Sequence, residues 1–121
     1  MIHRNGPPGA LEDLLVLDLT DEKGMYIGKL MADMGAQVVK VEPPGGDPGR
    51  DIGPFHGDQP DPAGSLFYWY HNTSKQSVTL DIHSPEGQEL FKRLAGQADV
   101  VLETYAPGFM ASLGLDYTSL S

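Results

Sequence analysis

Residues 14–42, LLVLDLTDEKGMYIGKLMADMGAQVVKVE, have the pattern of a strand, a helix and a second strand. Apolar runs of strand length lie at residues 14–19 and 37–41. The apolar side chains between them recur at helical spacing: Ile27, Leu30, Met31 and Met34. Gly35 then follows the helix, at the position where a residue in the left-handed conformation commonly ends a helix. The stretch predicts two parallel strands joined by a right-handed crossover helix. In such units, small molecules bind at the edge where the strands' carboxyl ends meet the helix's amino end.

The rest of the chain continues this alternation of strands and helices. Residues 75–81 alternate polar and apolar side chains, which predicts a half-buried strand. Ser84 and Pro85 suit the cap and first position of a following helix. Its predicted inner face comprises Leu90, Phe91, Leu94 and Ala98. Residues 99–103 predict a fourth strand, and a short helix is expected after Pro107. This order predicts an α/β fold, a Rossmann-like, doubly wound and mainly parallel sheet with flanking helices.

A turn-rich segment separates the second strand from the third, at residues 43–64. Its carboxylates lack the spacing of a calcium loop and are interpreted as solvated turn residues. They are Asp47, Asp51, Asp58 and Asp61. Glu42 is interpreted as a solvated strand end. Residues 63–70, AGSLFYWY, fit a short helix or a strand, and we favour the helix.

The composition limits the classes of function. Eight Lys and Arg residues against 17 Asp and Glu give a net charge of −9, which argues against nucleic acid and anionic membranes as partners. The absence of cysteine excludes disulfides and thiolate metal sites, and the four histidines lack the spacing of a metal pair, so we expect no metal. We find neither a signal peptide nor a membrane-spanning run and expect a cytoplasmic protein. We expect a flexible arm at residues 1–10 and one domain at residues 11–121.

Several nucleotide-binding and catalytic motifs are absent. The segment between the first strand and its helix contains only Gly24, so it lacks the glycines of the dinucleotide fingerprint. The chain also has no nucleoside triphosphate loop and no Gly-x-Ser-x-Gly elbow.

Four segments together resemble the amino-terminal part of the class III CoA-transferases. They are VLDL at 16–19, LMADMGAQVVKVEPPGGDPGR at 30–50, NTSKQSVTLDIHSPEGQELFKRLAGQADVVLETYAPG at 72–108 and LGLDYTSL at 113–120. The family includes formyl-CoA, carnitine and bile-acid CoA-transferases, and α-methylacyl-CoA racemases share its fold. The similarity runs from about Leu11 to the last residue and covers only the beginning of a family subunit.

The resemblance implies a Rossmann-like core that holds CoA, substrates that are a CoA thioester and a carboxylic acid, and an interlocked homodimer. An aspartate would carry the acyl group as a covalent intermediate. That aspartate is expected beyond Ser121, so we expect the domain to be incomplete at its C-terminal end and this chain alone to be inactive. Two alternatives stay open: a fragment of an α-methylacyl-CoA racemase, and a non-catalytic fragment that needs a complementary chain.

The resemblance also implies six residues in contact with CoA: Glu22, Lys23, Gly24, Lys75, Thr104 and Tyr105. The first three offer amides at a helix amino end. Lys75 falls on the lysine of the family's Asn-x-Asn-Lys-Arg-Ser stretch, and the last two would lie beside the nucleotide. Pro43, Gln76 and Ala106 stand where the family often has basic residues, which we expect to weaken phosphate binding.

Overall fold

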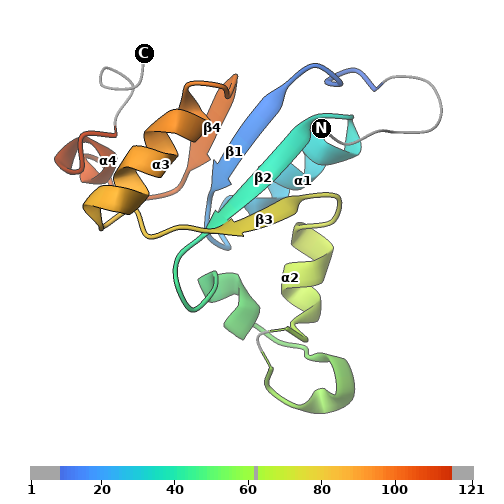
Figure 1. Cartoon of the computed structure of the whole chain (residues 1–121). Coiled ribbons are helices and arrows are strands. Elements are labelled where there is room, and N and C mark those ends of the chain that lie inside the picture. Colours follow the sequence, from blue (N-terminus) through green and yellow to red (C-terminus); the bar gives the residue numbers. More distant parts are fainter. Residues whose placement is uncertain (1–8, 62, 116–121) are drawn as a thin grey trace.

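The computed structural model describes residues 9–61 and 63–115, which form a parallel sheet with helices on both faces (Figure 1). The elements in chain order are β1 (Leu15–Leu19), α1 (Met25–Asp33), β2 (Gln37–Glu42), the 3-10 turns η1 (Pro48–Asp51) and η2 (His56–Asp58), α2 (Leu66–His71), β3 (Gln76–Thr79), α3 (Pro85–Ala95), β4 (Val100–Glu103) and α4 (Phe109–Ser112). No helix within these described ranges is long and apolar enough to cross a membrane.

The four strands lie in the order β3-β2-β1-β4, and every pairing is parallel. Val16 of β1 is in register with Val38 of β2 on one side and with Val100 of β4 on the other. The strand at the start of residues 14–42 is therefore central, and all four strands present their carboxyl ends at one edge.

The sheet is doubly wound, with α1 covering one face and α3 the other (Figure 1). Leu17 and Leu19 of β1 belong to the core cluster that contains Phe91 of α3. Val16, which points to the opposite face, clusters with Ala32 of α1. This alternation along one strand is the pattern of a sheet covered on both sides. The predicted fold class is confirmed.

The apolar series that indicated α1 does not form the face that packs on the sheet. Three of its four residues are exposed by 42 to 53%: Ile27, Leu30 and Met34. The buried face comprises Met25, Gly28 and Ala32. A Cβ at Gly28 would lie 2.5 Å from Oδ2 of Asp18, so the helix approaches the sheet too closely for larger side chains. Small residues therefore face the sheet.

The third strand is more exposed than predicted. All four residues of β3 are exposed, and β3 is an edge strand that pairs only with β2. In α3, Ser84 caps the helix by accepting a hydrogen bond from the amide of Gly87 at 3.0 Å, as expected. Phe91 is fully buried, whereas Leu90 is exposed and does not belong to the inner face.

The aromatic stretch forms the helix α2, in which Ser65 accepts a hydrogen bond from the amide of Tyr68 at 3.1 Å. Most of the predicted N-terminal arm, residues 1–8, lies outside the described residues, as do residues 116–121. Gly9 lies against the end of α1, where a Cβ would meet the carbonyl of Met34 at 2.3 Å.

Candidate functional site

The loop after β1 is joined to the end of β4 by one side chain. The amide of Asp21 donates to Oγ1 of Thr104 at 2.9 Å, and this hydroxyl donates to Oδ1 of Asp21 at 2.9 Å. A Cβ at Gly24 would lie 2.6 Å from Cγ2 of Thr104. The structure thus brings Gly24 and Thr104, both predicted site residues, together at the carboxyl edge of the sheet.

The same loop carries an exposed cation. Lys23 donates to Asp21 through its ammonium and, at 2.9 Å, through its amide. Burial alone would raise the pKa of Asp21, but the hydrogen bonds from Lys23 and Thr104 lower it below the usual value. The Lys23 side chain is 65% exposed, and the hydrogen bond to Asp21 raises its pKa. Glu22 is also exposed. This loop therefore offers a charged ammonium to solvent.

Tyr105 provides an aromatic surface next to Thr104. Its ring packs on Phe109 with 4.6 Å between the centroids, and its amide donates to Oε2 of Glu103 at 2.8 Å. Burial raises the pKa of the phenol, and the charges of Asp47, Glu103 and Asp21 raise it further. The hydroxyl therefore stays protonated at neutral pH.

Lys75 lies apart from this exposed surface. Its ammonium donates to Oδ2 of Asp18 at 2.6 Å, to the carbonyl of Met25 at 3.0 Å and to Oδ1 of Asn72 at 2.7 Å. The side chain is only 1% exposed. Burial lowers the pKa of Lys75, and the charge of Asp18 opposes that shift. All three ammonium protons have protein partners in this arrangement.

Lys75 belongs to a buried charge network that the sequence did not reveal, comprising Asp18, Lys40, Asp47 and Lys75. The ammonium of Lys40 lies 3.6 Å from Oδ1 of Asp18 and 3.1 Å from Oδ2 of Asp47, and it also donates to the carbonyl of Thr20. Asp47 is buried, so its interpretation as a solvated turn residue is wrong. The two carboxylates and two ammonium groups compensate each other.

Glu42 is also buried, contrary to its interpretation as a solvated strand end. Arg50 donates to its two oxygens through Nε at 2.6 Å and Nη2 at 2.9 Å, and Ser77 donates a third hydrogen bond. Burial alone would raise the pKa of Glu42, but these bonds lower it to about 2. The sequence did contain a signal for the burial of Glu42. In a sheet covered on both faces, a charged residue in an apolar strand is itself buried and needs a partner.

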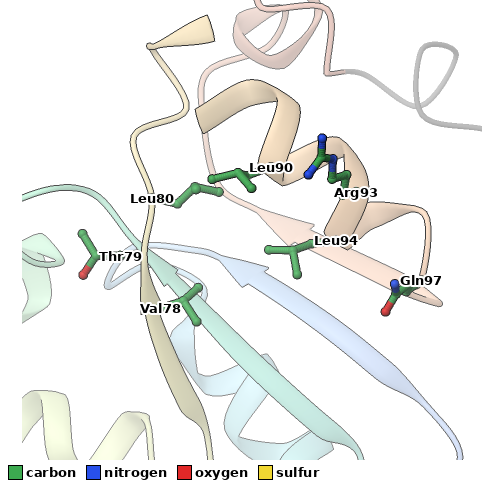
Figure 2. A pocket seen from close by; sticks show the side chains of 7 residues that line it. All are labelled: Val78, Thr79, Leu80, Leu90, Arg93, Leu94 and Gln97. Carbon is green, nitrogen blue, oxygen red and sulfur yellow. The ribbon is translucent and has the colours of Figure 1, made fainter. Parts of the chain in front are cut away.

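A shallow hollow lies elsewhere, between β3 and α3 (Figure 2). It has a volume of about 230 Å³ and is lined by Val78, Thr79, Leu80, Leu90, Arg93, Leu94 and Gln97. None of the predicted site residues lines it. Within the described part of the chain, no group of three or more His, Cys, Asp or Glu side chains could hold a metal ion.

Comparison with known proteins identifies the family. The sequence model of CoA-transferase family III matches residues 11–121. The chain belongs to this family. It is 42% identical over 106 residues to the succinyl-CoA:(R)-benzylsuccinate CoA-transferase subunit BbsE of Thauera aromatica, covering 88% of this chain and 26% of that protein. It is 38% identical over 113 residues to the human succinyl-CoA:glutarate CoA-transferase, covering 91% and 25%.

The fold is shared with solved members of the CoA-transferase family III. A crystal structure of a CAIB/BAIF family protein from Brucella suis superposes with a TM-score of 0.83 at 36% identity, over 94% of this chain and 30% of that chain. The predicted family is thus confirmed. The chain spans about a quarter to a third of the length of these relatives.

Proposed function

We propose that this chain is the CoA-binding portion of a class III CoA-transferase, an enzyme that moves CoA between carboxylic acids. One structural observation supports the proposal most: Thr104, which follows β4, is hydrogen-bonded to Asp21 in the loop after β1, at the carboxyl edge of a parallel sheet. This edge is where open α/β sheets bind their ligands. The names of the Thauera and human relatives support transfer between CoA thioesters and acids.

The proposed CoA contacts are the loop Glu22, Lys23 and Gly24 together with Thr104 and Tyr105. In this proposal, Lys23 pairs with a phosphate, amides at the start of α1 add hydrogen bonds, and the ring of Tyr105 packs against the nucleotide. The carboxylates of Asp21 and Glu22 repel a polyanionic ligand. Much of the electrostatic attraction in the proposed site therefore comes from the exposed ammonium of Lys23.

The proposal assigns no catalytic residue to this chain. The acyl-carrying aspartate is expected beyond Ser121, and we expect no turnover by the chain alone. An interlocked homodimer or a complementary chain completes the proposed enzyme. Exposed apolar side chains on α1 support such an assembly, among them Tyr26, Ile27 and Leu30. Sedimentation tests this part, because a chain that stays monomeric at all concentrations and with candidate partner chains contradicts it.

Isothermal calorimetry with CoA tests the proposed binding. We expect saturable heat for the wild-type chain and an affinity about tenfold lower for Lys23→Ala, since a charge-assisted hydrogen bond contributes about 1.5 to 3 kcal/mol. Lys92→Ala is the matched control, because Lys92 is an exposed cation on α3. We expect it to bind CoA like the wild type.

Folded wild-type protein that gives no heat with millimolar CoA would refute the proposal. Equal losses in Lys23→Ala and Lys92→Ala would show general charge attraction, which would refute the assigned loop. Circular dichroism of each variant establishes that it is folded.

A further inference from the structure

We propose that Lys75 is a positioning residue, which acts through Asp18 to hold the loop after β1 and the start of α1 in the shape that receives the ligand. The inference rests on the proposed CoA site for its meaning, but its principal test needs no ligand. It differs from the contact expected from the family resemblance, in which the ammonium touches CoA directly.

The ammonium of Lys75 ties three separate elements together. Asp18 belongs to β1, Met25 is the first residue of α1, and Asn72 directly follows α2. The distances from Nζ are 2.6 Å to Asp18, 3.0 Å to the Met25 carbonyl and 2.7 Å to Asn72. One side chain from the segment before β3 thus fixes where α1 begins relative to β1.

Asp18 extends this link into the ligand loop. Its Oδ1 accepts hydrogen bonds from the amide of Thr20 at 2.9 Å and from the Thr20 hydroxyl at 2.5 Å. The next residue, Asp21, is the one that binds Thr104. A continuous path of hydrogen bonds and one peptide link therefore runs from Lys75 to both segments of the candidate site.

Burial makes this arrangement specific. Asp18 is fully buried and Lys75 nearly so, so removing either charge destabilises the protein, although Asp18 keeps Lys40 at 3.6 Å when Lys75 is replaced. Gly28 provides the necessary room, since a Cβ there would lie 2.5 Å from Oδ2 of Asp18 and 3.0 Å from Nζ of Lys75. The lack of a side chain at Gly28 thus allows α1 to pack directly against the ion pair.

Amide hydrogen exchange on the full chain without ligand is the direct test. We expect Lys75→Met to accelerate exchange at least tenfold at residues 20–28 and 104–105, with much smaller changes in α3. A general loss of stability would accelerate exchange in all elements alike, so the local pattern separates positioning from a structural role. Lys92→Met is the control and should match the wild type.

Two further variants keep the test decisive if Lys75→Met unfolds. Asn72→Ala removes one partner of the ammonium without stranding a charge, and it should produce the same local pattern more weakly. Asp18→Asn with Lys75→Met removes both charges, and it should exchange more slowly at residues 20–28 than Asp18→Asn alone. Wild-type exchange in the ligand loop of folded Lys75→Met or Asn72→Ala would overturn the proposal.

Ligand binding distinguishes positioning from direct contact. If Lys75 acts through the loop, Lys75→Met should lower the affinities for CoA, 3′-dephospho-CoA and adenosine by the same factor. A loss confined to phosphate-bearing ligands would mean direct contact and would overturn the proposal. If the wild-type chain binds none of these ligands, the proposed function fails, while the exchange measurement still decides whether Lys75 orders the loop.

Discussion

Gly24 lies against Thr104, where the two segments of the candidate site meet. We predict that Gly24→Ala destabilises the protein by about 1 to 3 kcal/mol, the usual range for overpacking. The added Cβ would meet Cγ2 of Thr104 at 2.6 Å and the Thr20 side chain at 3.1 Å. Urea denaturation measures the change.

Thr104→Ser provides the matched rescue. It removes the methyl group that the added Cβ would meet but keeps the hydroxyl that binds Asp21. The double variant should therefore regain most of the lost stability. Equal stability of Gly24→Ala with and without Thr104→Ser would mean that the two segments do not approach each other in this way.

Glu42 should make the stability of the protein depend on pH in acid. Its pKa is about 2 in the folded protein, against 4.5 without these contacts, so its contribution is complete above pH 4.5 and is lost as the pH falls towards 2. The shift corresponds to about 3 kcal/mol. We predict a matching fall in the free energy of unfolding, measured by urea titration at several pH values.

Glu42→Gln isolates this contribution. The amide keeps the shape of the side chain and does not titrate, so the variant should be less stable at pH 6 but lose less stability between pH 4.5 and 2. A wild-type pH profile in the variant would assign the acid sensitivity to other carboxylates.

The sequence singled out individual charged residues but did not show which partners surround them in the fold. Lys75 was found through its motif, yet its partner Asp18 lies 57 positions away, a pairing that appears only when β3 and β1 join one sheet. Asp47 was also misread: Lys40 of β2 lies nearby in the sequence, but nothing in the local pattern shows that this carboxylate is buried against the Lys40 ammonium. Long-range pairing of charges is set by topology, which local spacing does not encode.

At the scale of single elements, the start of α3 depends on Gly87. A Cβ at this position would lie 1.7 Å from the carbonyl oxygen of Asp81. We predict that Gly87→Ala costs about 3 kcal/mol or more, because the obstacle is backbone and cannot rotate away. Thermal unfolding measures the loss.

Gly96, at the other end of α3, is the matched control. Its φ of −62° is ordinary for any residue, and a Cβ there would be in normal contact at 3.5 Å. Gly96→Ala should change stability by no more than about 0.5 kcal/mol. Similar losses in both variants would contradict the close packing of the α3 N-terminus.

The helices were easier to predict than the faces they bury. Caps such as Ser84 and a left-handed residue such as Gly35 are local signals, and both lie where predicted. In α1, Leu30 belongs to the apolar series but is exposed, whereas Gly28 faces the ion pair under the helix. Periodicity identifies the helix, but only the packing shows which side faces the sheet.

At the scale of the whole molecule, α1 presents apolar side chains outward on a chain that spans 25 to 30% of the relatives compared. The parallel sheet and its class followed from the order of strands and helices. The parallel pairing also places the carboxyl ends of the strands together at one edge, as expected. The sequence pattern did not show that the apolar side chains of α1 are exposed, because that depends on how the helix packs on the sheet.

Mapping CoA onto the chain by NMR shows directly whether the loop after β1 and the end of β4 bind the ligand. In ¹⁵N spectra recorded during titration with CoA, we predict saturable shifts at the amides of Glu22, Lys23, Gly24, Thr104 and Tyr105. The amides of Lys92, on the exposed surface of α3, and of Gln97, which lines the hollow, should stay unchanged. Absence of shifts at millimolar CoA, or shifts confined to the hollow between β3 and α3, would contradict the account.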